Sequence, residues 1–230
     1  IYADAGERDA GPLPVDVNEG DLLNLFVEAH GTLDGDARVG VRVGRQELLF
    51  DKQRLVGPLD WANTRRTFDG VSAWIERSCW RVDAFATRPT VVDPDALDEA
   101  NSDVDFAGVW LAAKPWEGGK ADAFVLYRGK DGAKWLGVTD DEARFTIGAG
   151  ANGPIEGTRL DWDAEAAVQL GTFGGESILA GNATAELGWK PRVACFEPRL
   201  AIGADWASGD DGPGGDLGTY DPLFPTGHLF

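Results

Sequence analysis

Apolar and polar residues alternate with a period of two along most of the chain. In residues 37–44 every odd position is Ala or Val and every even position is Arg or Gly. Because a strand points successive side chains to opposite faces, this alternation indicates a strand with one apolar and one polar face. Residues 160–171 repeat it over a length close to the ~9–11 residues that a tilted strand needs to cross a bilayer. Further runs cover residues 22–33, 67–76, 80–87, 104–113, 121–128, 144–150, 178–189 and 199–207. The pattern predicts an all-β chain of roughly ten strands.

The connections between these runs alternate between short and long. Short connections fall at residues 34–35, 77–78, 115–120, 151–159 and 190–198, and longer ones at 51–66, 89–103, 129–142 and from 208 onward, with 172–177 as a short exception on the second side. Short turns on one rim and long loops on the other are the layout of an outer-membrane β-barrel. A soluble β-sandwich or up-and-down barrel is the alternative, because its strands also alternate.

The two faces of the predicted strands favour the membrane barrel. The apolar faces carry Trp80, Trp162, Trp189 and Trp206 near the expected rims, which is typical of an interfacial girdle, although tryptophan is also common in soluble cores. A soluble core would be apolar, whereas the opposite faces carry charges among Gly and Ala: Arg38, Arg42, Arg81, Asp83, Asp161, Asp163, Glu165, Arg199 and Asp205. The sequence therefore predicts an antiparallel up-and-down transmembrane β-barrel as a single domain over residues 1–230, with a loop or partial strand over residues 1–21.

Composition narrows the class of protein further. Of 230 residues, 43% are hydrophobic and 26% are charged, which excludes a disordered protein. The formal net charge of -18 argues against a nucleic-acid partner, because binding phosphates needs a basic surface. No apolar run is long enough for a transmembrane helix, and no signal peptide is visible at residue 1. The lack of methionine leads us to expect a processed product or a piece of a longer chain.

Little in the sequence predicts catalysis or a cofactor. The two cysteines lie far apart without a CxxC or Cys-His spacing, and the two histidines are His30 and His228. No nucleophile or phosphate-binding motif occurs. Asp161 and Asp163 would suit a glycoside hydrolase, but on one strand they fit a polar face. We therefore expect neither an enzyme nor a cofactor, and the alternative is a soluble antiparallel β protein that binds or hydrolyses carbohydrate.

Five segments carry a family resemblance: VRVGRQELLF (41–50), GPLDWANTRRTFDGV (57–71), WRVDAFATRP (80–89), GADWASGDD (203–211) and GTYDPLFPTGH (218–228). They resemble the alginate export family of outer-membrane β-barrel porins, and the resemblance covers nearly the whole chain. It implies an anion-selective channel in a Gram-negative outer membrane, which passes alginate or another anionic oligosaccharide through a lumen lined with basic side chains. Family barrels have roughly eighteen strands. We therefore expect a central stretch of a larger barrel, with a small closed barrel as the alternative.

Arginines on the polar faces and loop ends are the candidate substrate-binding residues. A carboxylated sugar loses water in a narrow lumen, and a guanidinium replaces that solvation with two hydrogen bonds. The candidates for the lumen and its mouth are Arg38, Arg42, Arg45 (if a bulge turns it inward), Arg65, Arg66, Arg81 and Arg199. Adjacent strand residues point to opposite faces, so we expect only Arg66 of the adjacent pair to face the lumen. The alternative for each arginine is a salt bridge to an acidic neighbour.

The expected partners are an anionic oligosaccharide or polysaccharide, outer-membrane lipid and lipopolysaccharide, and periplasmic export proteins. Two segments are rich in carboxylates: Asp93, Asp95, Asp98, Glu99, Asp103 and Asp105 in one, and Asp210, Asp211, Asp216 and Asp221 in the other. Calcium prefers such oxygen ligands, but no EF-hand spacing occurs. We interpret both segments as solvated loops without a metal site.

Overall fold

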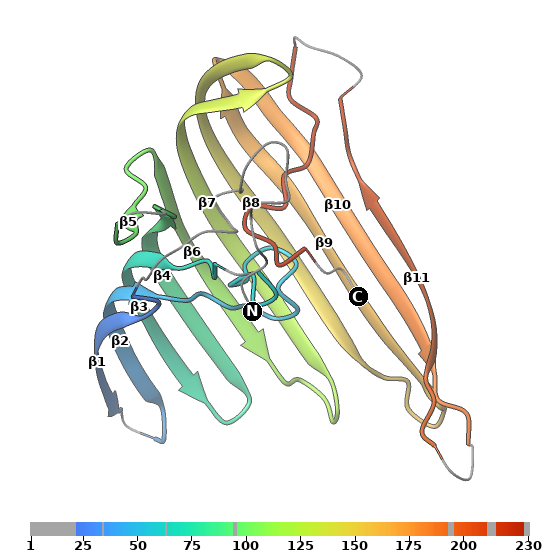
Figure 1. Ribbon diagram of the computed structural model, residues 1–230. Coiled ribbons are helices and arrows are strands. Elements are labelled where there is room, and N and C mark those ends of the chain that lie inside the picture. The colour runs from blue at the N-terminus through green and yellow to red at the C-terminus, as the bar shows by residue number, and fades with distance from the viewer. Residues whose placement is uncertain are drawn as a thin grey trace, which may run out of the picture.

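The chain folds into one antiparallel β-sheet. The computed structural model describes residues 22–33, 35–62, 64–93, 96–192, 196–210 and 215–227. The strands are β1 (Leu25–Thr32), β2 (Arg38–Gln46), β3 (Phe68–Arg77), β4 (Trp80–Val91), β5 (Glu99–Ala100), β6 (Val104–Ala113), β7 (Lys120–Trp135), β8 (Val138–Pro154), β9 (Leu160–Phe173), β10 (Glu176–Trp189) and β11 (Leu200–Ala207). Ten strands pair with their neighbours in chain order, and β5 pairs with β4 alone. The sheet curves around two chain segments that lie against its concave face (Figure 1).

The all-β, up-and-down fold predicted from the sequence is confirmed, and each predicted run lies on one strand. Among the described strands, β1 and β11 form the two edges of an open sheet. No helix within the described ranges is long and apolar enough to cross a membrane. Residues 1–21 lie outside the described part of the chain, so the loop or partial strand expected there stays a prediction.

The loop predicted over residues 129–142 is wrong. Strands β7 and β8 continue through it as a hairpin and meet at Leu136 and Gly137, whose φ angles of 46° and 85° form the turn. Beyond the register shift that follows Lys130, Lys134 pairs with Thr139. Polar residues dominate this part of the hairpin, so no apolar face marks these strands in the sequence. The short strand β5 is also new, and it lies inside the connection expected over residues 89–103.

The convex face of the sheet is apolar and exposed. Val109, Val125, Ile147 and Val168 occupy directly paired positions on β6 to β9, and each is more than 40% exposed. Other exposed apolar residues of the strands include Val41, Val43, Val71, Leu111, Leu170, Leu179, Leu187 and Ile202. A soluble protein rarely exposes so continuous an apolar surface, whereas a membrane barrel turns one toward lipid.

Tryptophans lie toward the ends of this apolar face. Trp162 is paired with Leu187 of β10, and its ring stacks on Trp116 of the turn between β6 and β7, with ring centroids 6.3 Å apart. Trp189 and Trp206 are 48% and 61% exposed. These three tryptophans lie toward strand ends, where the sequence predicts an interfacial girdle, and the girdle itself stays a prediction. Trp80, its fourth predicted member, lies at the start of β4 and lines a cavity.

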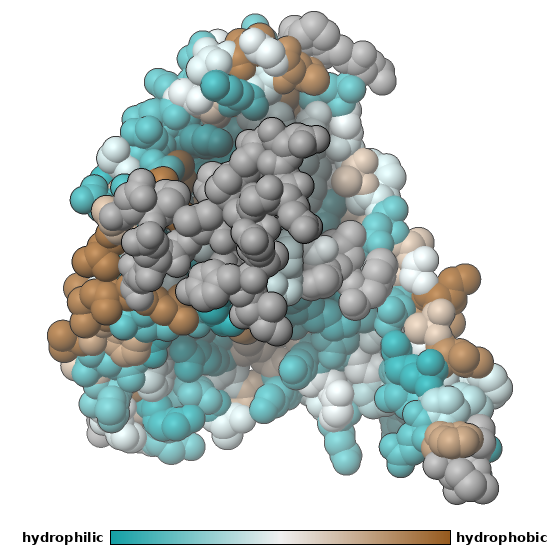
Figure 2. Space-filling view, viewed as in Figure 1, coloured by the Kyte–Doolittle hydropathy of each residue, from teal (hydrophilic) through white to brown (hydrophobic). Residues whose placement is uncertain are grey.

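The concave face differs from the open, wet surface that the sequence led us to expect. Its centre is a hydrophobic core that includes Phe85, Phe106, Trp110, Phe124 and Leu126. Hydrophilic residues dominate the visible lower part of the concave side (Figure 2). The core is buried because two chain segments cover it.

Candidate functional site

Two connections that the sequence presents as open loops fold onto the concave face and form a plug. We define the plug as residues 47–62 and 64–67, which join β2 to β3, together with residues 215–227, which follow β11 (Figure 1). The two segments pair in parallel through Val56 and Phe224. The Gly57 amide donates to the Phe224 carbonyl, and the Phe224 amide donates to the Leu55 carbonyl, each at 2.9 Å. These hydrogen bonds join the two segments to each other.

Aromatic packing anchors the plug to the sheet. The Phe224 ring lies 5.3 Å from Phe68 and 4.7 Å from Phe106, and both contacts are edge-on. The Phe50 ring stacks on Trp110, with centroids 5.0 Å apart and planes 10° apart. Such pairs contribute roughly 0.5–1.5 kcal/mol each beyond the area that they bury.

A first charged contact joins the β2–β3 segment of the plug to β9. Arg54 Nη2 lies 2.5 Å from Asp163 Oδ1, Lys52 Nζ lies 2.8 Å from Asp163 Oδ2, and Arg54 Nη1 lies 3.8 Å from Glu165. Burial opposes the charge on Arg54, but the hydrogen bond and charge of Asp163 outweigh it and raise the pKa of the guanidinium above its ordinary value. Arg54, Asp163 and Glu165 are all buried, so this is a desolvated cluster of two carboxylates and their cations.

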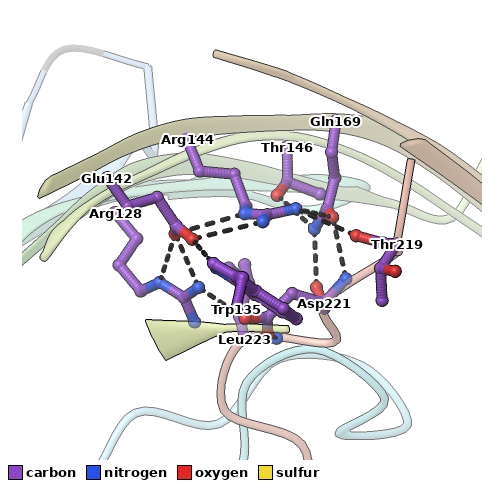
Figure 3. Close-up of polar contacts among 9 residues, drawn as sticks. All are labelled: Arg128, Trp135, Glu142, Arg144, Thr146, Gln169, Thr219, Asp221 and Leu223. Carbon is purple, nitrogen blue, oxygen red and sulfur yellow. Dashed lines mark hydrogen bonds and ion pairs between the residues drawn. The ribbon is translucent and has the colours of Figure 1, made fainter. Parts of the chain in front are cut away.

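A second charged contact joins the other plug segment to β7 and β8 (Figure 3). Glu142 accepts hydrogen bonds from Arg128 at 2.7 Å and from Arg144 at 3.2 Å. Asp221 of the plug adds a second carboxylate, with its Oδ2 atom 2.5 Å from Arg128 Nη2. Gln169 then binds the plug backbone, since its Nε2 donates to the Asp221 carbonyl at 2.6 Å and its Oε1 accepts from the Asp221 amide at 2.9 Å. The result is a network of two arginines and two carboxylates.

The plug turns are shaped by aspartates. Asp221 Oδ1 accepts a hydrogen bond from the Leu223 amide at 2.7 Å, which is an Asx turn over the Asp-Pro-Leu sequence. Asp210 accepts from the amides of Gly218 and Thr219, at 2.6 and 2.9 Å, and from the Thr219 hydroxyl. These two carboxylates, which the sequence interpretation treats as part of a solvated loop, hold the segment after β11 in place.

Comparison with known proteins decides the family. The alginate export family model matches residues 3–230. The chain belongs to the alginate export family. No curated protein and no solved structure matched it. Family membership and the all-β sheet together support an alginate-export-related protein of the outer membrane, and the family implies a polysaccharide substrate.

In this member of the alginate export family, four of the arginines predicted to bind substrate lie along the polar side of the strands, each beside carboxylates. Their nearest carboxylate oxygens belong to Glu76 for Arg38 (2.9 Å), Glu28 for Arg42 (2.6 Å), Asp83 for Arg81 (2.5 Å), and both Asp161 and Glu186 for Arg199 (2.6 Å each). The four are spread from β2 to the start of β11, so the structure does not gather them into one pocket. Their predicted role in binding substrate is not tested by these contacts.

The remaining three predicted arginines lie where the sheet meets the plug or the β4–β6 connection. Arg45 binds Asp69, its partner across β2 and β3, at 2.9 Å, without a bulge in that register. Arg65 binds Glu47, which raises its pKa above the ordinary value. Arg66 has no carboxylate partner among the described residues, and it donates instead to the carbonyls of Gly57 and Pro225.

Arg66 therefore differs from the other six predicted arginines. Its hydrogen bonds of 3.0 and 3.1 Å join one plug segment to the other, and its guanidinium lies 5.5 Å from the centre of the Phe224 ring. Burial lowers the pKa of Arg66 to about 10, so it stays charged at neutral pH. It is a fixed positive charge at the plug.

A cavity of about 450 Å³ lies between the plug and the short-turn rim of the sheet. Its lining includes Phe50 and Asp51 of the plug, Arg81 and Asp83 of β4, and Lys114 and Lys120 beside the next turn. Both cations and carboxylates line it. Within the described part of the chain, no three His, Cys, Asp or Glu side chains are grouped as a metal site would need. Asp95, Asp211, Cys195 and His228 lie outside the described residues.

Proposed function

We propose that this alginate export protein forms the wall of an anion-selective channel in a Gram-negative outer membrane, which transports an anionic polysaccharide and performs no catalysis. The observation that carries the proposal is the division of one sheet into an exposed apolar face and a concave face that carries paired charged side chains beside its aromatic core. Lipid and lipopolysaccharide would cover the first, and the polysaccharide would pass along the second. Periplasmic export proteins would meet the short-turn rim.

The arrangement of charges suits the transport of a polyanion better than its tight binding. Each of the four predicted arginines along the strands has a carboxylate within hydrogen-bond distance, so none of these four offers an unshared anion site. Conduction requires binding that is strong enough to admit a substrate and weak enough to release it. A polyanion that exchanges partners along such pairs would bind weakly and repeatedly.

Replacing Arg66 with glutamine is expected to lower the preference for anions. A unit charge about 8 Å from a permeating ion in water changes its free energy by about 0.5 kcal/mol, which corresponds to a roughly twofold change in the permeability ratio. The measurement is the reversal potential in a salt gradient across a planar bilayer, with protein purified from outer membranes. The matched control E47Q/R65Q removes the neighbouring ion pair without changing net charge. Equal reversal potentials for R66Q and the parent would remove Arg66 from the anion path.

Replacing Ile147 with arginine tests the membrane-facing assignment of the convex face. Ile147 lies in the middle of the apolar band, paired with Val125 and Val168. A charge at the bilayer midplane is expected to destabilise the barrel by about 2–4 kcal/mol. Urea unfolding in lipid vesicles measures the loss, and Ile147→Leu is the control. An arginine variant as stable as the leucine variant would show that this face does not contact lipid.

A further inference from the structure

The wall site that receives Asp221 is built for a carboxylate. On the wall itself, Arg128 and Arg144 share a single carboxylate, Glu142, and all three side chains are at least nine-tenths buried. Two cations and one anion leave the site with one unmatched positive charge. Asp221 supplies the missing anion, but it belongs to the plug and not to the wall.

Removal of the plug segment would also free hydrogen-bonding groups around this site. The Gln169 Nε2 donor would lose the Asp221 carbonyl, and its Oε1 acceptor would lose the Asp221 amide. Arg128 would lose the carboxylate of Asp221, while Thr146 would keep its 3.0 Å contact with Gln169. A guanidinium beside an amide that both donates and accepts suits a sugar ring that carries a carboxylate and hydroxyl groups.

The two plug segments are held by contacts of opposite polarity. The segment after β11 presents a carboxylate, Asp221, to Arg128 of the wall. The β2–β3 segment presents Lys52 and Arg54 to carboxylates of the wall, Asp163 and Glu165. An arriving polyanion can replace Asp221 at the arginines, but it is repelled by Asp163 and Glu165. It would therefore compete with one segment and leave the other docked.

We propose that Arg128, Arg144 and Gln169 form a binding subsite for the carboxylate of a uronate residue, and that Asp221 occupies this subsite as an internal substitute until a polyuronate displaces it. Displacement releases residues 215–227 from the wall, while residues 47–62 stay bound through Arg54. The inference rests on the proposed function for its substrate class. Under this proposal Asp221 competes with the substrate, and the plug opens by release of residues 215–227 rather than residues 47–62.

The test compares uronate binding in the parent and in Asp221→Asn, which keeps the shape of the side chain and removes its charge. Loss of the competing charge-assisted hydrogen bond is expected to raise the affinity for an alginate oligosaccharide about tenfold. Asp216→Asn is the control, because Asp216 lies on the same segment and is exposed. Unchanged affinity in Asp221→Asn, or an equal rise in Asp216→Asn, would overturn the proposal.

Amide hydrogen exchange provides the second measurement. Alginate oligosaccharide is expected to accelerate exchange in residues 215–227 and, within residues 47–62, only at Gly57, whose amide donates to the Phe224 carbonyl. A disulfide between I178C and L217C, which are bridge partners, should abolish both the acceleration and the binding until it is reduced, in a background with both native cysteines replaced by serine. An equal response to a neutral maltooligosaccharide would overturn the proposal, because the carboxylate would then be irrelevant.

Failure of the channel proposal is distinguishable from failure of this inference. If the protein binds uronate in competition with Asp221 but shows no conductance in bilayers, the result supports the subsite and contradicts the channel proposal. If the protein conducts anions but the parent and Asp221→Asn bind uronate with the same affinity, the result supports the channel proposal and contradicts the subsite.

Discussion

Replacing Glu142 with glutamine is expected to lower the free energy of unfolding by about 3–5 kcal/mol, which is the usual loss when one partner of a buried ion pair is removed. Glu142 is 3% exposed and accepts hydrogen bonds from Arg128, Arg144 and the Trp135 indole. Without its charge, Arg128 would keep Asp221 as its carboxylate partner, and Arg144 would keep none among the described residues. Urea unfolding followed by tryptophan fluorescence measures the change.

Two further variants make the Glu142 result specific. Glu176→Gln is the matched control, because Glu176 is exposed at the start of β10, and a change within about 0.5 kcal/mol is expected there. The double variant E142Q/R144M removes one of the two stranded cations and should recover part of the stability. A loss below about 1 kcal/mol in Glu142→Gln would mean that solvent reaches this network and stabilises both arginines.

Replacing Arg54 with methionine is expected to release the β2–β3 segment of the plug. Methionine keeps the length and apolar packing of the side chain, but it leaves Asp163 and Glu165 buried with Lys52 as their nearby cation. The cost of such an uncompensated charge is about 3–5 kcal/mol, which is large enough to shift the plug toward an undocked state. Amide exchange in residues 47–62 measures this shift directly.

The control for Arg54 lies on the same carboxylate. Lys52 also binds Asp163, but its side chain is 44% exposed, so Lys52→Met should cost about 1 kcal/mol or less. Faster amide exchange is therefore expected in Arg54→Met than in Lys52→Met, and the sheet should keep its protection in both. Equal exchange in the two variants would contradict a docking role for the buried guanidinium.

The strands were predictable because their two faces meet different surroundings. Val41 and Val43 face outward, whereas Arg42 between them binds Glu28 on the other face. The sequence therefore alternates between apolar and polar residues with a period of two. Where the hairpin of β7 and β8 is polar beyond Lys130, the alternation disappears, and the sequence was interpreted as a loop although the backbone pairs. Periodicity therefore reports differences between faces rather than pairing itself.

The plug was missed, although strand β6 carried a signal for it. Phe106 and Trp110 are buried on one face of β6, while Val109 and Leu111 are exposed on the other. Apolar side chains on the concave face of β6 would be exposed to water in an open lumen. Another part of the chain is therefore needed to cover them. The sequence does not say which part, because each connection has turn residues and apolar side chains.

The candidate site was only partly accessible from the sequence. Arg66 was singled out by its position beside Arg65, and it is the member of the seven without a carboxylate partner in the described structure. Arg128 and Arg144 lie at the ends of predicted strands, and no motif in the sequence marks them as binding residues. Their partner Asp221 lies 93 residues from Arg128, and no local spacing encodes a contact at that separation.

The parallel pairing of Val56 with Phe224 has a consequence for the order of assembly. Each hairpin of the sheet closes between neighbours in the chain, whereas the hydrogen bond from Arg66 to the Pro225 carbonyl closes a loop of 159 residues. Distant contacts form late, because the entropy of closing a long loop is lost before any contact compensates for it. We therefore expect the aromatic centre of the concave face to be completed last, so that Phe106, Trp110 and Phe124 stay accessible to water until both segments dock.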